Sequence, residues 1–290
     1  MAKILDGKEV AAALGAKLAE KTERLIEAGT QPTLAVLRVG ERADDLSYER
    51  GLVKRAEAVG VAVRRVVLPA TCTQGELEAE FGKLNADDEV HGILMFRPLP
   101  EGLDDRPIVD AMDPAKDVDG ITAGSMAGVF MNSGEGFAPC TAQACIEILD
   151  HYGIGLLGKK AAVVGRSLVI GRPVAMMLMH RHATVTICHT RTTDMQSITR
   201  DADIVVVAAG KMETIGAEYF AEGQTVIDVG IGWNTEKNKL CGDVKFDEVE
   251  PLVAQITPVP GGVGSVTTSV LMAHVVESAE KQHKRLCGFG

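Results

Sequence analysis

The chain has 290 residues with a formal net charge of −10, and 46% of its residues are hydrophobic and 24% charged. This composition excludes an intrinsically disordered chain, and the negative charge argues against nucleic acid as a partner, because nucleic acid needs a basic face. The longest apolar runs, such as 204–209, are too short to span a bilayer, and the start MAKILDGKEV lacks the apolar core of a signal peptide, so we expect a cytoplasmic protein without membrane association.

Six cysteines are spread along the chain without a CxxC pair and without a zinc-like spacing to histidine. The common cysteine-based metal sites require such spacings. We therefore expect reduced thiols and no bound metal.

The first hundred residues alternate between helical and strand patterns. Helices are predicted at 8–28, 46–59 and 73–84, and strands at 33–39, 61–68 and 90–96. Thr73 followed by Glu76 has the spacing of a capping box at the start of a helix. Strands separated by helices and short loops are typical of a parallel sheet covered by helices.

The alternation stops in a looser stretch, 101–137, and then resumes. Strands are predicted at 161–164, 184–188, 204–208 and 225–229, and helices at 171–181 and 266–281. The pattern therefore predicts an α/β protein of two successive units, with a boundary near 139–158.

A glycine-containing turn, 165–171, joins the strand at 161–164 to the helix that follows it. Backbone amides of such a turn and the N-terminus of the next helix favour a pyrophosphate. Ser167 stands where the dinucleotide motif GxGxxG has its second glycine, so the motif is incomplete. An ordinary glycine turn in an α/β protein would have the same sequence pattern.

The strand at 184–188 is followed by His189, Thr190 and Arg191. An acid at this strand end binds the ribose hydroxyls of NAD, whereas a basic residue accommodates the 2′-phosphate of NADP. Arg191, together with Thr190 and Arg166, favours NADP over NAD. The alternative is that Arg191 is a solvated loop residue.

Eight segments resemble, in order, the methylenetetrahydrofolate dehydrogenase/cyclohydrolase family: PAKDVDG (114–120), PCTAQA (139–144), GRSLVIGRP (165–173), ATVTICHTRT (183–192), ADIVVVAAG (202–210), VIDVGI (226–231), GDV (242–244) and TPVPGGVG (257–264). They are spread from 114 to 264, and KDVDG and TPVPGGVG together are the most specific of them.

The resemblance implies two Rossmann-like three-layer domains with parallel sheets that flank a cleft, and a C-terminal helix that returns to the first domain. The folate-binding catalytic domain would comprise 1–140 and 268–290, and the NADP-binding domain 141–267. The implied activity is the oxidation of 5,10-methylenetetrahydrofolate to 5,10-methenyltetrahydrofolate with NADP⁺ in one-carbon metabolism. The resemblance also implies a homodimer built through the nucleotide-binding domains.

The resemblance assigns the folate site by matched position. Tyr48 would lie along the pterin and p-aminobenzoate portion of folate, and Asp119 would accept hydrogen bonds from the pterin edge. These two are the predicted catalytic residues. Pro260 and Gly261 would form a wall of the folate pocket. The alternatives are that Asp119 caps a turn before Gly120 and that the PVPGG run is only a rigid loop.

The same matching implies a cofactor site lined by Thr141, Gly165, Arg166, Ser167, Ile170, Thr190, Arg191, Ala209, Gly210, Ile231 and Thr267.

Two positions of the predicted folate pocket depart from the bifunctional pattern of the family. The family has a lysine four residues after the tyrosine and a strand that ends in Gln-x-Pro-Leu-Pro, where this chain has Leu52 and Phe96. Lys54 does not replace the lysine, because six helical residues rotate the side chain some 120° away from the face of Tyr48. We expect Lys54 to be a solvated surface residue.

These two departures affect only one of the two activities. Hydride transfer yields a methenyl cation that N5 and N10 of the substrate stabilise, so it needs alignment rather than a protein base. Hydrolysis of that cation needs a group that activates water and moves protons, which Leu52 and Phe96 cannot do. We therefore expect a dehydrogenase whose cyclohydrolase activity is lost or weak.

Three alternatives remain open. The chain could be the full bifunctional dehydrogenase/cyclohydrolase, or a folate- or nucleotide-binding protein without turnover. It could also be a two-domain oxidoreductase of hydroxy acids. That last class requires a catalytic histidine or lysine in the cleft, and none of the seven histidines is an obvious candidate.

Overall fold

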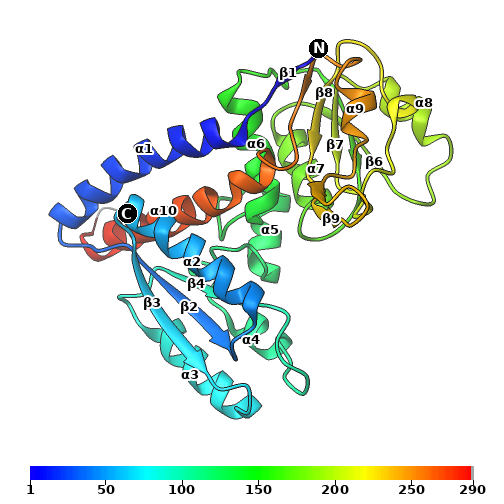
Figure 1. Cartoon of the computed structure of the whole chain (residues 1–290). Helices are drawn as coiled ribbons and strands as arrows, with labels where there is room; N and C mark the ends of the chain where they lie inside the picture. The colour runs from blue at the N-terminus through cyan, green and yellow to red at the C-terminus, as the bar shows by residue number, and fades with distance from the viewer. Residues whose placement is uncertain (289–290) are drawn as a thin grey trace. The chain divides into compact units, whose positions relative to one another are not determined.

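A computed structural model describes residues 1–288, which fall into two compact units (Figure 1). The three-stranded unit consists of Ala13–Ala138 and the segment from Thr268 onward, and the six-stranded unit of Met1–Ala12 and Pro139–Thr267. Residues 1–12 were expected in the first unit. They join the six-stranded unit because β1 (Lys3–Ile4) pairs with β11 (Gln255–Ile256), and this pairing adds a strand to its sheet.

The three-stranded unit contains a parallel sheet of order β3-β2-β4. Its elements are α1 (Gly7–Glu27, which begins in the other unit), β2 (Thr33–Val39), α2 (Ala43–Ala58), β3 (Ala62–Leu68), α3 (Gln74–Ala86), β4 (Gly92–Met95), α4 (Arg106–Ala111), α5 (Ala123–Met131) and α10 (Thr267–Leu286). Both faces of β2 are buried. On one face Ala35 and Leu37 pack into a core with Leu77 of α3, and on the other Leu34 and Val36 are buried as well. A strand buried on both faces is typical of a parallel sheet between helical layers.

The six-stranded unit contains a parallel sheet of order β1-β11-β8-β7-β5-β6. Its further elements are α6 (Cys140–His151), β5 (Lys160–Val164), α7 (Gly171–His180), β6 (Thr184–Cys188), α8 (Met195–Arg200), β7 (Ile204–Val207), β8 (Thr225–Asp228), the hairpin β9 (Gly232–Asn234) and β10 (Lys239–Cys241), α9 (Phe246–Val249), and two short 3₁₀ helices, Ala217–Tyr219 and Val263–Ser265. The chain passes from β5 to β6 on one side and then returns to β7 on the other. This reversal is the switch point at which open α/β sheets bind ligands.

The predicted strands and helices are all present, with shifts at their ends. The capping box is confirmed, because the Thr73 hydroxyl accepts from the Glu76 amide and the Glu76 carboxylate accepts from the Thr73 amide. One expectation was wrong, because the stretch 101–137, expected to be loose, contains α4 and α5. The division between the units falls at 138/139, at the start of the expected boundary region, and that region holds α6.

The six cysteines are free thiols, and five of them are buried. Among the described residues 1–288, no helix is both long and apolar enough to cross a membrane.

A buried ion pair fastens α2 to the sheet of the three-stranded unit. Arg38 of β2 donates from Nε to the Glu49 carboxylate of α2 at 2.9 Å, and both residues are less than 10% exposed. Arg65 approaches the other carboxylate oxygen of Glu49 at 3.2 Å, and the Arg38 guanidinium also donates to the Gly40 carbonyl. The pair therefore fixes the helix that carries Tyr48.

Removal of one partner should destabilise the fold strongly. Glu49→Leu leaves the buried Arg38 without its carboxylate, and we expect it to lower the free energy of unfolding by about 3–5 kcal/mol. The double variant Arg38→Met/Glu49→Leu removes both charges and should recover most of that loss. Urea unfolding followed by far-UV circular dichroism measures both, since the single tryptophan, Trp233, lies in the other unit. Equal stability of the two variants would contradict the role of the pair.

Candidate functional site

In the three-stranded unit, predicted folate residues meet at the carboxyl ends of β2 and β4. These strands are paired, with Leu37 opposite Met95, so the residues that follow them emerge side by side. Phe96 directly follows β4, and its ring meets the ring of Tyr48 edge-on with centroids 5.5 Å apart. Tyr48 is 46% exposed and Phe96 is 7% exposed. The two rings therefore form an aromatic edge of the kind that a flat, pterin-like ring packs against.

Leu52 lies one helical turn beyond Tyr48 on α2 and is 1% exposed. A leucine and a phenylalanine side chain neither gain nor lose protons, so the two departures from the bifunctional pattern make this region apolar. Lys54 is exposed, as expected for a solvated surface residue.

The carboxylates of the KDVDG turn have different environments. Asp117 is fully buried and accepts hydrogen bonds from the amides of Ile121 at 3.0 Å and Thr122 at 2.7 Å. Asp119 is half-buried. Asp117 therefore caps this turn, while the role of Asp119, as a pterin ligand or as a turn cap, stays a prediction.

Two buried basic side chains support the same turn. Lys116 donates from Nζ to the carbonyls of Asn85 at 2.8 Å and Asp87 at 2.7 Å, and desolvation lowers the pKa of this ammonium group. His274 of α10 bonds through Nδ1 to the Val118 carbonyl at 2.8 Å. Its ring stacks on Phe137 at 4.8 Å, and burial lowers the pKa of the imidazole. Neutral His274 thus holds the backbone next to Asp119.

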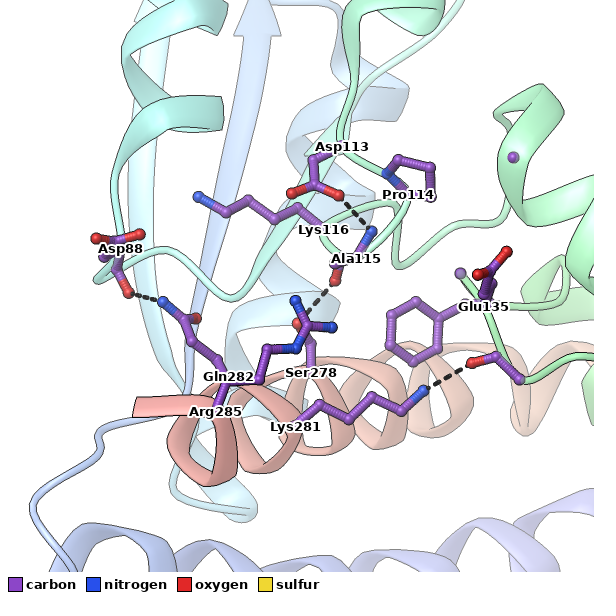
Figure 2. Close-up of a pocket in the computed structure, with 14 residues that line it drawn as sticks. Asp88, Asp113, Pro114, Ala115, Lys116, Glu135, Ser278, Lys281, Gln282 and Arg285 are labelled. Carbon is purple, nitrogen blue, oxygen red and sulfur yellow. Dashed lines mark hydrogen bonds between the residues drawn. The ribbon is translucent and has the colours of Figure 1, made fainter. Parts of the chain in front are cut away.

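A cavity of about 710 Å³ in the three-stranded unit is lined by none of the predicted folate residues (Figure 2). Three of its polar side chains, all on α10, bind the protein itself: Lys281 donates to the Gly134 carbonyl at 3.1 Å, Gln282 to that of Asp88 at 2.7 Å, and Ser278 to that of Ala115 at 2.7 Å. These contacts fasten α10 to the neighbouring loops and give a structural reason for the polar lining.

In the six-stranded unit, the turn after β5 has the geometry that a dinucleotide site needs. Gly165 has φ +134°, and a Cβ there would clash with the Ala208 carbonyl at the end of β7. A Cβ at Gly171, the first residue of α7, would clash with the Gly165 carbonyl. The Ser167 hydroxyl accepts from the Ile170 amide at 3.1 Å, which shapes the turn in place of the missing glycine. The residues present therefore fit a pyrophosphate at the N-terminus of α7.

The turn after β6 presents the basic residues predicted to select NADP. The His189 amide donates to the Thr192 hydroxyl at 2.8 Å, and the Arg191 amide donates to His189 Nδ1 at 3.1 Å. Thr190 and Arg191 are exposed. Val164 and Cys188 are register partners, so Arg166 and Arg191 follow neighbouring strand ends.

Two buried aspartates lie at the ends of β8 and of the hairpin. Asp228 and Asp243 are 3% and 1% exposed. Asp228 accepts from the amides of Gly230, Asp243 and Val244 at 3.0–3.1 Å, and Asp243 accepts from the Gly210 amide at 2.8 Å. Burial, the largest cause, and the charge of Asp243 raise the pKa of Asp228, the three N–H hydrogen bonds lower it, and together they bring it to about 7.

The remaining predicted residues lie around these turns or near the ends of the unit. Ala209 and Ile231 are exposed, and Thr141 and Thr267 are half-buried. Pro260 and Gly261 also belong to the six-stranded unit, whereas the other predicted folate residues belong to the three-stranded one. The Gly261 carbonyl accepts from the Gly7 amide at 2.8 Å, which anchors their loop at the start of α1.

Several residues that shape these sites are not predicted from the motifs. Asp117 and Lys116 lie inside the KDVDG segment, and Asp228 and Asp243 lie inside VIDVGI and GDV. A charged residue within an otherwise apolar strand was the available signal for Asp228. His274 lies in a helix without any local mark of its partner, which is 156 residues away.

Comparison with known proteins identifies the family. Residues 5–119 match the family model of the tetrahydrofolate dehydrogenase/cyclohydrolase catalytic domain, and residues 139–283 match that of its NAD(P)-binding domain. A relative named bifunctional protein FolD from Carboxydothermus hydrogenoformans is 46% identical over 97% of this chain and 98% of its own length. Another of that name, from Clostridioides difficile, is 43% identical over 97% and 98%.

Solved structures agree with this match. The bifunctional FolD enzyme of Campylobacter jejuni has a TM-score of 0.92 at 38% identity and covers 97% of this chain and 99% of its own. The methylenetetrahydrofolate dehydrogenase-cyclohydrolase of Trypanosoma brucei, solved with an NADP cofactor and an inhibitor, has a TM-score of 0.87 at 36% identity and covers 97% and 98%. The resemblance and the fold class predicted from the sequence are therefore confirmed, and the chain belongs to the tetrahydrofolate dehydrogenase/cyclohydrolase family.

Proposed function

We propose that the chain oxidises 5,10-methylenetetrahydrofolate to 5,10-methenyltetrahydrofolate by hydride transfer to NADP⁺. Family membership supports both ligand classes. The observation that carries the proposal is the glycine turn after β5, which lies at the switch point of a parallel sheet and whose Gly165 and Gly171 leave room for close backbone approach. Bound NADP⁺ would supply the carbon that accepts the hydride.

The protein residues of this reaction hold and orient the ligands. In the proposal, the exposed Tyr48 ring packs along the folate, and Asp119 accepts hydrogen bonds from the pterin edge on a turn that Asp117 and His274 make rigid. The apolar side chains of Leu52 and Phe96 help to exclude water. No side chain needs to transfer a proton, because the two substrate nitrogens share the positive charge of the product.

The same apolar side chains support the second part of the proposal, a lost or weak cyclohydrolase activity. Hydrolysis requires a group that activates water, and Leu52 and Phe96 occupy the positions of the family's lysine and glutamine. The relatives favour the alternative, since those at 43–46% identity are named bifunctional. The bifunctional enzyme is therefore the second candidate. It would need a base that Leu52 does not supply, and Lys54 is the lysine of α2 that a test can remove.

NADP preference rests on Arg166 and Arg191, and the relative solved with NADP supports it. The nearest acid after β6, Asp194, accepts from the Ser197 amide at the start of α8. That carboxylate is used for helix capping. A homodimer through the nucleotide-binding units is also proposed, on the family resemblance alone.

The first test is reduction of the dinucleotide. The purified chain with 5,10-methylenetetrahydrofolate and NADP⁺ should generate the absorbance of reduced nicotinamide. Asp119→Ala should lower kcat/KM roughly ten- to hundredfold, because a charged hydrogen bond is lost. Asp110→Ala, which removes an exposed carboxylate of the same unit, should have no effect. The proposal would be overturned if the chain reduced neither NADP⁺ nor NAD⁺.

The second test separates the dehydrogenase from the bifunctional enzyme. The decay of 5,10-methenyltetrahydrofolate should be no faster with the wild-type protein than without it, while Leu52→Lys/Phe96→Gln, if it folds, should accelerate the decay. Clear hydrolysis by the wild-type protein would establish the bifunctional alternative. Loss of that hydrolysis in Lys54→Ala, but not in Lys83→Ala on the exposed face of α3, would then identify Lys54 as the base.

The third test concerns cofactor choice. Arg191→Ala should weaken NADP⁺ binding roughly ten- to hundredfold and leave NAD⁺ binding nearly unchanged, because only NADP⁺ carries the phosphate that the guanidinium pairs with. Isothermal titration calorimetry with both dinucleotides measures this. Arg200→Ala, at an exposed position on α8, is the control. Equal weakening of both dinucleotides would show that Arg191 does not read the phosphate.

A further inference from the structure

We propose that Asp228 and Asp243 are positioning residues that hold the loops after β7 and β8 in the arrangement that binds the nicotinamide dinucleotide. This inference rests on the proposed function, because Gly210 and Ile231, the cofactor residues of these loops, are themselves predicted from the family resemblance. The aspartates would not touch the cofactor. They would act through the backbone amides that they bind.

Asp228 joins two chain segments at the carboxyl edge of the sheet. It is the last residue of β8, and its Oδ1 accepts from the Gly230 amide at 3.1 Å and from the Asp243 amide at 3.1 Å. Its Oδ2 accepts from the Val244 amide at 3.0 Å. One carboxylate thus fixes the turn that leads to Ile231 and also the segment that follows the β9–β10 hairpin.

Asp243 extends the connection to a third segment. Its backbone is held by Asp228, and its Oδ2 accepts from the Gly210 amide at 2.8 Å. Gly210 has φ +69°, a conformation that a glycine adopts at little cost. The loop after β7 is therefore fixed through Asp243 to the loop after β8, and these are two neighbouring strand ends.

Two glycines allow this close packing. A Cβ at Gly242 would clash with the Asp228 carboxylate, and a Cβ at Gly230 would clash with the carboxyl group of Asp243. Thr257 completes the group, because its hydroxyl accepts from the Asp228 amide at 2.8 Å. The segments thus approach one another so closely that they form one assembly around the two carboxylates.

The charge state of Asp228 determines whether all of these bonds can form. The ionised carboxylate only accepts, so it satisfies three amides at once. Protonation converts one oxygen into a donor that faces an N–H group, and at least one bond is lost. Burial and the charge of Asp243 raise the pKa of Asp228 to about 7. Among the described residues, Asp243 is the charged group that acts on Asp228. The loops should therefore be held firmly above pH 7 and loosen below it.

The same ionisation has the opposite effect on the stability of the fold, which it lowers. The pKa of Asp228 is higher in the folded chain than its ordinary value of 3.8, so the folded state binds more protons between these two values. Ionisation of Asp228 therefore lowers the free energy of unfolding as the pH rises from about 4 to 7, while it raises cofactor affinity. If Asp228 only stabilised the fold, cofactor affinity would not rise over a pH range in which the free energy of unfolding falls.

The experiment compares the wild type with Asp228→Asn, which imitates the protonated carboxyl by placing an N–H₂ group against an amide. The control is Asp247→Asn, which removes an exposed acid of α9 in the same unit. Calorimetry gives the Kd for NADP⁺ and for NAD⁺ from pH 6 to 8.5. NAD⁺ is included because it lacks the 2′-phosphate, which itself titrates in this range. Hydrogen exchange of peptides that contain Gly210, Gly230 and Val244 reports on the loops without cofactor.

The wild type and the control should bind both dinucleotides more tightly as the pH rises through 7. Asp228→Asn should show a flat profile with NAD⁺ and bind it roughly three- to tenfold more weakly at pH 8, the effect of about one hydrogen bond. In the wild type, the protection of the three amides from hydrogen exchange, corrected for the intrinsic exchange rate, should rise over the same pH range. This measurement tests the inference without any substitution.

Unchanged affinity and pH dependence in Asp228→Asn would overturn the inference, as would amide protection in the wild type that does not change with pH. Either result leaves the proposed function intact as long as the wild type binds a dinucleotide. A wild type that binds neither NADP⁺ nor NAD⁺ would instead overturn the proposed function itself.

Discussion

Parallel strand pairing fixes where functional groups can stand in both units. The carboxyl ends of paired parallel strands meet at one edge, so residues far apart in the sequence become neighbours when each directly follows a strand. Phe96 follows β4 in this way, Gly165 follows β5, and Asp228 ends β8. The register of the ladders, rather than the loops, sets these positions, and the buried ion pair of Arg38 adds α2 to the same rigid frame.

The two units prepare their sites by different physical means. The folate candidates of the three-stranded unit offer hydrocarbon and aromatic surface, supported by a turn whose buried polar groups are all engaged in hydrogen bonds with the backbone. The six-stranded unit offers backbone amides, close-packed glycines and a few arginines. A chain with a net charge of −10 can bind an anionic dinucleotide in this way, because the amides and arginines create a local positive field without a basic surface.

The pattern of apolar residues predicted most of the sheet frame, since strands such as β2, β5 and β7 are short apolar runs bounded by turns. It missed α5, whose many small residues give no clear helical period, and α6, which lies where a linker was expected. β1 and β11 have two residues each, too few for any periodicity.

Site residues can be predicted from the sequence where a family motif marks them. The roles of the residues beside them cannot be predicted in this way. Lys116 binds carbonyls about thirty residues away, and Asp228 binds amides about fifteen residues away. A local pattern can mark such a residue, as the charge at the end of an apolar strand marks Asp228, but its partners depend on tertiary contacts that no local pattern shows.

The pairing of β1 with β11 matters for anyone who divides this chain into fragments. A fragment that starts at Pro139 would lack the outermost strand of the six-stranded sheet and would expose the unpaired edge of β11. Open strand edges template pairing with other molecules. An expressed nucleotide-binding fragment would therefore need the first residues of the chain grafted back, or a circularly permuted design, in order to stay monodisperse.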